Sequence, residues 1–343
     1  MPFRHAVFAM GTRFEIVLSG DDEVFLRAVA EEALEVIVAQ EQQWSLFRRD
    51  SLLARINREG WQRPVLLDAD SFELFEDALA VREQSGGAFD VGVAGLMRAW
   101  GLHEHSMLPA EHVADARSEE SGASRGLRPA VLNDVPPFEL DPVARTIRLT
   151  HEVAALDLGA IAKGHALDLA ARVVTEYGIE SALIHGGTSS VVAIGAPPGE
   201  EVWRVAVAGG EQEEHAGGPR LACRMIARLR DAALGVSAHH GRTANLEGRR
   251  IGHVMDPRTG EPSRSHAVVA AVIAPTARLA DAWSTAALVN AGLGVARPAG
   301  VCAAVAVRRE SGIVWIIEGD VAEHFEHDER IARASAARWE DEE

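Results

Sequence analysis

The sequence predicts an α+β fold, in which strands joined mostly by turns build the sheets and helices are inserted in pairs. Alternating apolar and polar residues over 6–18, around a Met10-Gly-Thr12 turn, predict a strand or hairpin at the start of the chain. Apolar residues at helical spacing predict helices over 21–47 and 70–85, and Gly86-Gly87 ends the second of them. Later strand-like runs mostly follow one another through turns, which disfavours a doubly wound parallel sheet.

The rest of the chain continues this mixture of strands and helices. A strand, a turn and a helix are predicted over 153–177, and another helix over 281–291. The remaining strand-like runs are 130–132, 146–149, 181–184, 191–194, 203–207, 224–229 and 267–273, followed by a hairpin of 302–307 with 313–318. By length, we expect one large or two ordinary domains, with a polar insertion at about 102–129 and an acidic tail at 336–343.

Composition narrows the classes of function. The 343 residues carry a formal net charge of −17, so we expect no chain-wide attraction to nucleic acid or to an anionic membrane. The sequence lacks the roughly 18 consecutive apolar residues that a membrane-spanning helix needs. Its N-terminus has no long apolar signal core, and its two cysteines, Cys223 and Cys302, form neither a metal spacing nor a disulfide framework. We therefore expect a reduced, cytoplasmic protein.

One lysine, Lys163, stands among the 34 basic residues, and all the others are arginine. Arginine replaces lysine well on a solvated surface, but not where a compact ammonium has to fit a tight site. The exception therefore indicates a functional position, although coding bias alone explains the general excess of arginine.

Lys163 lies in the segment with the densest chemistry, 155–168. A strand is expected to bring Asp157 to a glycine turn, after which a helix begins near Lys163. Gly159 and Gly164 permit close approach of a ligand, and a helix N-terminus favours anions. The segment is neither a Walker loop nor a dinucleotide fingerprint, and an ordinary strand-to-helix turn is the alternative interpretation.

A second candidate segment is 252–260. Its Asp256-Pro-Arg-Thr-Gly260 run is typical turn chemistry. His253 has a pKa range suited to a general base, and Arg258 is a potential anion-binding group. The alternative is a structural histidine.

A third candidate is the pair Asp281 and Thr285. Residues four apart lie on one face of a helix, and carboxylate and hydroxyl oxygens suit Mg²⁺. The alternative is that Asp281 caps the helix while Thr285 points at a backbone carbonyl.

Taken together and in this order, these segments resemble the FAD:protein FMN transferase (ApbE) family from about residue 8 to about residue 318. The matching motifs are Met10-Gly-Thr12, Trp44-Ser-Leu-Phe-Arg-Arg-Asp-Ser51 with Asn57, Gly86-Gly-Ala-Phe-Asp-Val91, Asp157-Leu-Gly-Ala-Ile-Ala-Lys-Gly164 with Asp168, His253-Val-Met-Asp-Pro-Arg-Thr-Gly260 and Ala280-Asp-Ala-Trp-Ser-Thr285. The resemblance implies a single ApbE-type domain over 1–335, built from two tightly associated T-fold-like halves with FAD in the cleft between them. It also implies a Mg²⁺-dependent transfer of FMN from FAD to a threonine or serine of an acceptor flavoprotein, with release of AMP.

The resemblance further implies a role for individual residues. The metal would be held by the Ala160 carbonyl, Asp281 and Thr285, with Ser284 near that shell, and His253 would be the base. The implied flavin-nucleotide contacts are Met10, Phe47, Ala88, Phe89, Asp90, Asp157, Lys163 and Val254. Phe47 or Phe89 can offer an aromatic face to a ring of the nucleotide.

The sequence departs from the family pattern around the expected pocket. His165 stands where a large aromatic is more frequent, Thr188-Ser-Ser190 where Asn or Asp is common, and Ser237-Ala238 where Ser-Gly is usual. Two other activities therefore stay open: an FAD pyrophosphatase that uses water as acceptor, and a flavin-binding protein without transfer. Ser124, in a small-residue run that resembles an acceptor motif, is a candidate for self-modification against the simpler reading of a solvated loop.

Overall fold

The computed structural model describes residues 2–103, 106–108, 135–208, 224–239, 243–246, 249–294, 299–310, 312–319 and 324–327. Most of the expected insertion at 102–129, the strand at 130–132, Ser124 and the tail at 336–343 lie outside these residues. The helices are α1 Glu23–Trp44, α2 Leu52–Glu59, α3 Ala69–Gln84, the 3₁₀ turn η1 Val91–Val93, α4 Ala94–Ala99, α6 Ala162–Glu176 and α7 Ala277–Asn290.

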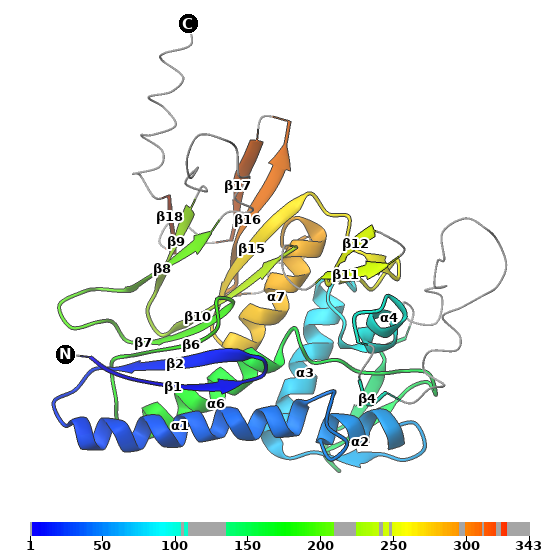
Figure 1. Cartoon of the computed structure of the whole chain (residues 1–343), viewed down its shortest axis with the longest axis horizontal. Helices are drawn as coiled ribbons and strands as arrows, with labels where there is room; N and C mark the ends of the chain where they lie inside the picture. Colours follow the sequence, from blue (N-terminus) through cyan, green and yellow to red (C-terminus); the bar gives the residue numbers. More distant parts are fainter. Residues whose placement is uncertain are drawn as a thin grey trace, which may run out of the picture.

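An eight-stranded antiparallel sheet runs through the molecule in the order β1-β2-β6-β7-β10-β15-β16-β17 (Figure 1). Its strands are β1 Phe3–Ala9, β2 Thr12–Leu18, β6 Ala182–Gly186, β7 Ser190–Ile194, β10 Ala232–Ala238, β15 Ala267–Ala274, β16 Cys302–Arg309 and β17 Gly312–Glu318. Smaller sheets are formed by β3 Val65–Leu66, β5 Thr146–Leu149 and β4 Phe138–Asp141; by β8 Trp203–Ala208, β9 Arg224–Leu229 and β18 Phe325–His327; by β11 Thr243–Leu246 and β12 Arg249–Gly252; and by β13 Met255–Asp256 and β14 Glu261–Pro262. This all-antiparallel pairing with inserted helices confirms the α+β prediction.

Helices α1, α6 and α7 cover one face of the large sheet (Figure 1). The main hydrophobic core lies between these layers, and it takes in the inward side chains Phe14 and Ile16 of β2 and most of α7, including Trp283. Because α7 packs against both β10 and β15 on one side and α6 on the other, it is buried almost all round. A polar side chain on α7 is therefore desolvated unless a partner or ligand meets it.

The opposite face of the sheet's second half is covered by β8, β9 and β18. Their apolar residues, such as Met225 and Phe325, pack on outward residues of β7, β10, β15 and β16 in a second core. No helix in the described part of the chain is long and apolar enough to cross a bilayer.

Two details of the predicted elements are wrong. The segment before Asp157 is not a strand: its backbone is irregular, and Leu156 N–H donates to Asn57 Oδ1 (2.7 Å) while Asn57 Nδ2 donates to Leu156 O (2.9 Å). Hydrogen bonds from the Asn57 side chain thus take the place of the backbone hydrogen bonds that a neighbouring strand would make. Helix α7 begins at Ala277 rather than near 281, because the Thr276 side chain caps it by accepting from Leu279 N–H.

Candidate functional site

Helices α6 and α7 meet at a backbone-to-backbone contact. A Cβ added at Gly164 would lie 2.2 Å from the Ala277 carbonyl oxygen, so only glycine permits this approach. One turn further along α6, the Asp168 carboxylate accepts the N–H groups of Ala277 (2.7 Å) and Arg278 (3.0 Å). Asp168 therefore satisfies the free amides at the start of α7, although burial raises the pKa of this carboxyl to about 6.

This packing places Asp281 in the interior, 5% exposed. Its carboxylate accepts Gly164 N–H at Oδ2 (2.8 Å) and the buried Ser190 hydroxyl at Oδ1 (2.8 Å) and Oδ2 (3.0 Å). Burial raises the pKa of Asp281 to about 6, while the positive charge of Lys163 and these hydrogen bonds act in the opposite direction. Asp281 is the fifth residue of α7, so the alternative in which it caps the helix is wrong.

The Ala160 carbonyl lies just before the start of α6, whose N-cap is Ile161. The first regular hydrogen bond of this helix runs from His165 N–H to Ile161 O (3.0 Å). Gly164 N–H is therefore one of the free amides of the first turn, and it donates to the Asp281 carboxylate of α7 (2.8 Å).

Thr285 lies one turn after Asp281 on α7. Its hydroxyl is 3.4 Å from Asp281 O and 3.2 Å from the Ser237 hydroxyl of β10. Ser237 is also 2.7 Å from the Ser284 hydroxyl, which donates to Asp281 O (2.8 Å). Thr285 therefore does contact a backbone carbonyl, as the alternative interpretation expected, but it also contacts the Ser237 hydroxyl.

Asp281, Thr285 and Ala160 would supply a carboxylate, a hydroxyl and a carbonyl oxygen. These are the hard donors that Mg²⁺ prefers, and a divalent cation would compensate the buried negative charge of Asp281. The described residues contain no cluster of three His, Cys, Asp or Glu side chains that could hold a metal. The donor set therefore fits Mg²⁺, with water at its remaining positions, better than a softer metal.

Lys163 lies at the start of α6, with its Nζ 3.5 Å from Gly159 O. Its charge is close enough to lower the pKa of Asp281. The single lysine of the sequence is thus adjacent to the most deeply buried of the predicted site carboxylates.

Asp157 is connected to the predicted residue Phe47 through His103, a residue that the sequence did not indicate. His103 Nε2 lies 2.7 Å from Asp157 Oδ2, and Gly159 N–H donates to Asp157 Oδ1 (2.8 Å). The ring of Phe47 meets the ring of His103 edge-on, with centroids 5.8 Å apart. His103 follows Trp100-Gly101-Leu102 at the start of the polar insertion, where the composition predicted a solvated loop.

The predicted contact residues of the loop 86–90 are buried, unlike Phe47. Phe89 and Ala88 are each 1% exposed and belong to the core, so any contact with a ligand would come from their backbone. Phe47, at 49% exposed, retains a face that can stack on a ring. Both oxygens of Asp90 have internal partners, Arg82 Nε (2.5 Å) and Gly92 N–H (2.7 Å), and burial raises its pKa.

Met10 forms the tip of the first hairpin. Met10 and Gly11 both have positive φ, 49° and 71°, which gives the two-residue type I′ turn that matches strand twist. Glu41 of α1 accepts Met10 N–H (2.8 Å) and fixes the tip over that helix.

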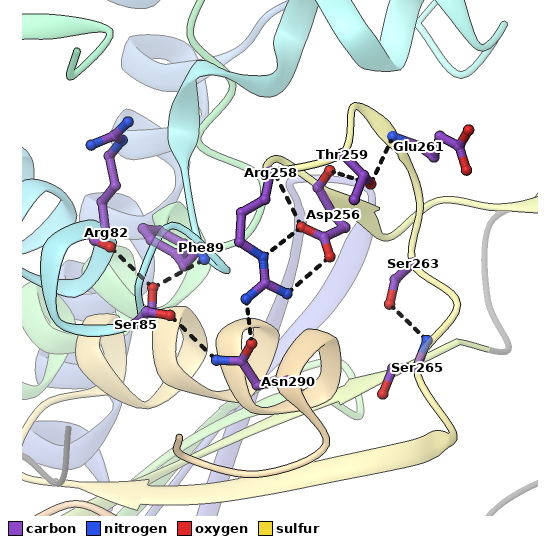
Figure 2. A network of polar contacts seen from close by, with 10 residues as sticks. All are labelled: Arg82, Ser85, Phe89, Asp256, Arg258, Thr259, Glu261, Ser263, Ser265 and Asn290. Atoms are coloured by element: carbon purple, nitrogen blue, oxygen red, sulfur yellow. Dashed lines mark hydrogen bonds and ion pairs between the residues drawn. The ribbon is translucent and has the colours of Figure 1, made fainter. Parts of the chain in front are cut away.

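The loop 252–262 carries His253 and Val254. Val254 is buried in the main core, and His253 is partly exposed beside it. Arg258 does not present a free guanidinium to an anion: Nε and Nη2 donate to the two oxygens of Asp256 (2.9 Å each), and Nη1 donates to Asn290 Oδ1 (2.8 Å), as Figure 2 shows. The expectation that Arg258 binds an anion is therefore corrected, since its donors already have protein partners.

Comparison with known proteins identifies the family. The family model described as the ApbE family matches residues 10–304. The chain belongs to the ApbE family.

Curated relatives agree with this family. A protein of Treponema pallidum named FAD:protein FMN transferase is 28% identical over 298 residues, which cover 84% of this chain and 78% of the relative. One of the same name from Escherichia coli is 26% identical over 326 residues, covering 91% and 83% of the two chains. The relatives are thus transferases, in agreement with the predicted class of enzyme.

Solved structures share the fold. The ApbE protein of Thermotoga maritima has a TM-score of 0.70 at 25% identity, with 93% of this chain and 96% of that chain covered. The flavin transferase ApbE of Vibrio cholerae has a TM-score of 0.73 at 20% identity and covers 93% of this chain and 98% of its own. An ApbE-type α+β fold is thereby confirmed, whereas the division into two T-fold-like halves within 1–335 stays a prediction.

Proposed function

We propose that this ApbE-family protein transfers FMN from FAD to a threonine or serine hydroxyl of an acceptor flavoprotein, in a Mg²⁺-dependent reaction that releases AMP. The observation that carries the proposal is the buried Asp281 carboxylate. This carboxylate accepts Gly164 N–H in the first turn of α6, and it lies on α7 one turn before Thr285. A carboxylate in this position is poorly explained as packing, because its burial opposes ionisation.

Asp281, Thr285 and the Ala160 carbonyl would hold Mg²⁺, which supplies charge neutralisation for phosphoryl transfer. Ser190 orients the Asp281 carboxylate by donating to both of its oxygens. Lys163 would add a second positive charge toward the pyrophosphate. A protein of net charge −17 thus binds a polyanionic nucleotide through a focused site rather than through its overall field.

His253 would accept the proton of the acceptor hydroxyl as that oxygen attacks the FMN phosphorus, and the bond to AMP breaks. The resulting products are a phosphoester of the acceptor and AMP, so atoms and charge balance without another reactant. Phe47, Asp157, Met10 and Val254 would contact the flavin nucleotide, with Ala88, Phe89 and Asp90 placed behind it.

The test is incubation with FAD, Mg²⁺ and a threonine-containing acceptor, with AMP and flavin-labelled acceptor quantified separately. Asp281→Ala and His253→Ala should abolish both products, while the exposed control Asp21→Ala should not. Calorimetric titration with Mg²⁺ should show that Asp281→Ala has lost metal affinity. Absence of both products with the wild-type protein would refute the proposal.

The same assay separates the two alternatives. AMP and FMN formed equally with and without acceptor would identify an FAD pyrophosphatase. FAD bound stoichiometrically and recovered unchanged would identify a flavin-binding protein. The cytoplasmic location and self-modification at Ser124 stay predictions.

A further inference from the structure

A chain of polar contacts runs from the loop of His253 to the loop of Ala88–Asp90 by way of the end of α7 (Figure 2). Arg258 Nη1 donates to Asn290 Oδ1 (2.8 Å), and Asn290 Nδ2 donates to the Ser85 carbonyl (3.3 Å). The Ser85 hydroxyl in turn accepts Phe89 N–H (3.2 Å). Three chain segments that are far apart in the sequence are therefore connected by one arginine and one asparagine.

The loop does not need this connection to form its own turn. Asp256 closes the turn alone: its Oδ1 accepts Arg258 N–H (3.0 Å), and its carbonyl accepts Thr259 N–H (3.2 Å) and Gly260 N–H (3.0 Å). These are the contacts of an Asx turn followed by a tight backbone turn. The reach of the Arg258 guanidinium to Asn290 thus has a consequence outside the turn, namely the position of the whole loop relative to α7.

The electrostatics of the junction favour a rigid link. Asn290 is the last residue of α7, so the guanidinium lies at the negative end of that helix. Asp256 engages the other edge of the guanidinium in a bidentate pair, which fixes its plane. The stem of Arg258 also passes over Gly87, where a Cβ would lie 3.4 Å from Arg258 Cγ.

We propose that Arg258 and Asn290 are positioning residues. They fix the loop 252–262, which carries His253, and the loop 86–90 relative to helix α7, which carries the proposed metal ligands. The proposal rests on the proposed function, since it concerns the same site. Helix α7 carries Asp281 and Thr285, and the two loops carry His253 and the backbone of Ala88–Asp90. Phosphoryl transfer depends mainly on positioning, and a displacement of about 1 Å can cost about 100-fold in rate.

The structure also indicates which step this link affects. Arg258 and Asn290 bond to protein groups rather than to the expected ligand positions, so losing them should leave FAD and Mg²⁺ affinity nearly unchanged. The alignment of base and phosphorus should suffer instead. The expected signature is a loss in kcat with little change in KM for FAD.

The test compares Arg258→Met with Arg264→Met. Arg264 lies just after the same loop, its side chain is 85% exposed, and it forms an ion pair with Glu261 (2.8 Å), so its replacement removes the same charge without touching the link. Arg258→Met should lower kcat by about 100-fold, with the FAD dissociation constant within about twofold of wild type and no loss of folded protein by circular dichroism. Arg264→Met should retain wild-type kcat.

Two further measurements keep the result interpretable. Asn290→Asp retains an acceptor for Arg258 but removes the donor to Ser85, so it should lower kcat by about tenfold even if Arg258→Met folds poorly. Methylguanidinium added to Arg258→Ala should restore part of kcat, because it can bind Asp256 and Asn290 in the space that the guanidinium has vacated.

Wild-type kcat in Arg258→Met or in Asn290→Asp would overturn the proposal. So would a loss in FAD affinity equal to the loss in turnover, since this would place the residues in ground-state binding. If the wild-type protein itself forms neither AMP nor labelled acceptor, the proposed function fails, and that outcome is distinct from failure of the link.

Discussion

Replacing Gly164 by alanine perturbs the contact on which the metal-binding geometry depends. The added methyl carbon would lie 2.2 Å from the Ala277 carbonyl oxygen and 2.5 Å from Arg278 N, about 1 Å short of the 3.4 Å at which ordinary contact begins. Both obstacles are backbone atoms at the start of α7, so neither can rotate away. Helices α6 and α7 would have to separate by about 1 Å.

Two effects of opposite sign decide the outcome. Alanine gains about 1 kcal/mol over glycine inside a helix. Overpacking costs about 1 to 3 kcal/mol, and weakening the hydrogen bond from Gly164 N–H to the Asp281 carboxylate costs about 1.5 to 3 kcal/mol more. The steric cost exceeds the gain in helix propensity, and we expect a net destabilisation of about 1.5 to 5 kcal/mol, or roughly 2 to 7 °C in Tm for a chain of this size.

Thermal unfolding followed by circular dichroism, together with Mg²⁺ titration, measures both consequences. The matched control is Gly20→Ala, where the nearest atom is a terminal methyl of the flexible Leu26 side chain at 3.2 Å. The control should unfold near the wild-type temperature. A Tm for Gly164→Ala equal to or above that of wild type would show that α6 and α7 do not meet through Gly164, and the argument for the site would fail with it.

Three further predictions concern single side chains of the same region. Lys163→Arg should weaken FAD binding or turnover, because a larger, planar guanidinium cannot place its charge where the compact ammonium lies, 3.5 Å from Gly159 O; wild-type kinetics would refute this. Burial lowers the pKa of His165 to about 4, so the folded state takes up fewer protons than the unfolded state between about pH 6.5 and 4, and stability falls as pH decreases through that range. The difference in unfolding free energy between His165→Phe and wild type, measured by urea unfolding, should therefore shift by about 2 kcal/mol in favour of the variant from pH 7 to pH 5. A difference that is the same at both pH values would contradict the assignment. His103→Gln keeps a donor for Asp157 and should retain more FAD affinity in a fluorescence titration than His103→Phe, which keeps only the ring beside Phe47; the reverse order would show that the ring matters more than the hydrogen bond.

Periodicity in the sequence located most of the regular elements. The first hairpin, α1, α3, α6, β9 and the last hairpin lie where the patterns predict them, because each depends on local spacing of apolar residues. The strand expected before Asp157 was wrong, since Asn57, about 100 residues away in the chain, supplies the hydrogen bonds that a neighbouring strand would have supplied. Short elements such as α2 and α4 were missed because they contain too few turns for a clear period.

In the candidate site, too, some residues could be recognised from local sequence and others only from contacts made in the folded protein. Asp281, Thr285, Asp157 and His253 could be selected from residue type and spacing. Ser190 and Ser237 stood out only as departures from the family pattern, and His103 did not stand out at all. Their roles come from partners that are distant in the sequence, namely Asp281, Thr285 and Asp157. Arg258 could be selected but was assigned the wrong partner, since the pattern shows its charge and not the Asp256 and Asn290 oxygens that occupy it.

By itself, then, the sequence determined the α+β class, the family and the chemical types present: one lysine in an acidic chain, a helical Asp and Thr pair, and a histidine in a glycine-bounded turn. Only the tertiary structure decided that Asp281 is buried, that its carboxylate accepts the free Gly164 N–H of α6, and that two loops are connected through the end of α7. The physical reason is that hydrophobic periodicity is a property of neighbouring residues, whereas desolvation and hydrogen-bond choice depend on which helices and strands pack against each other.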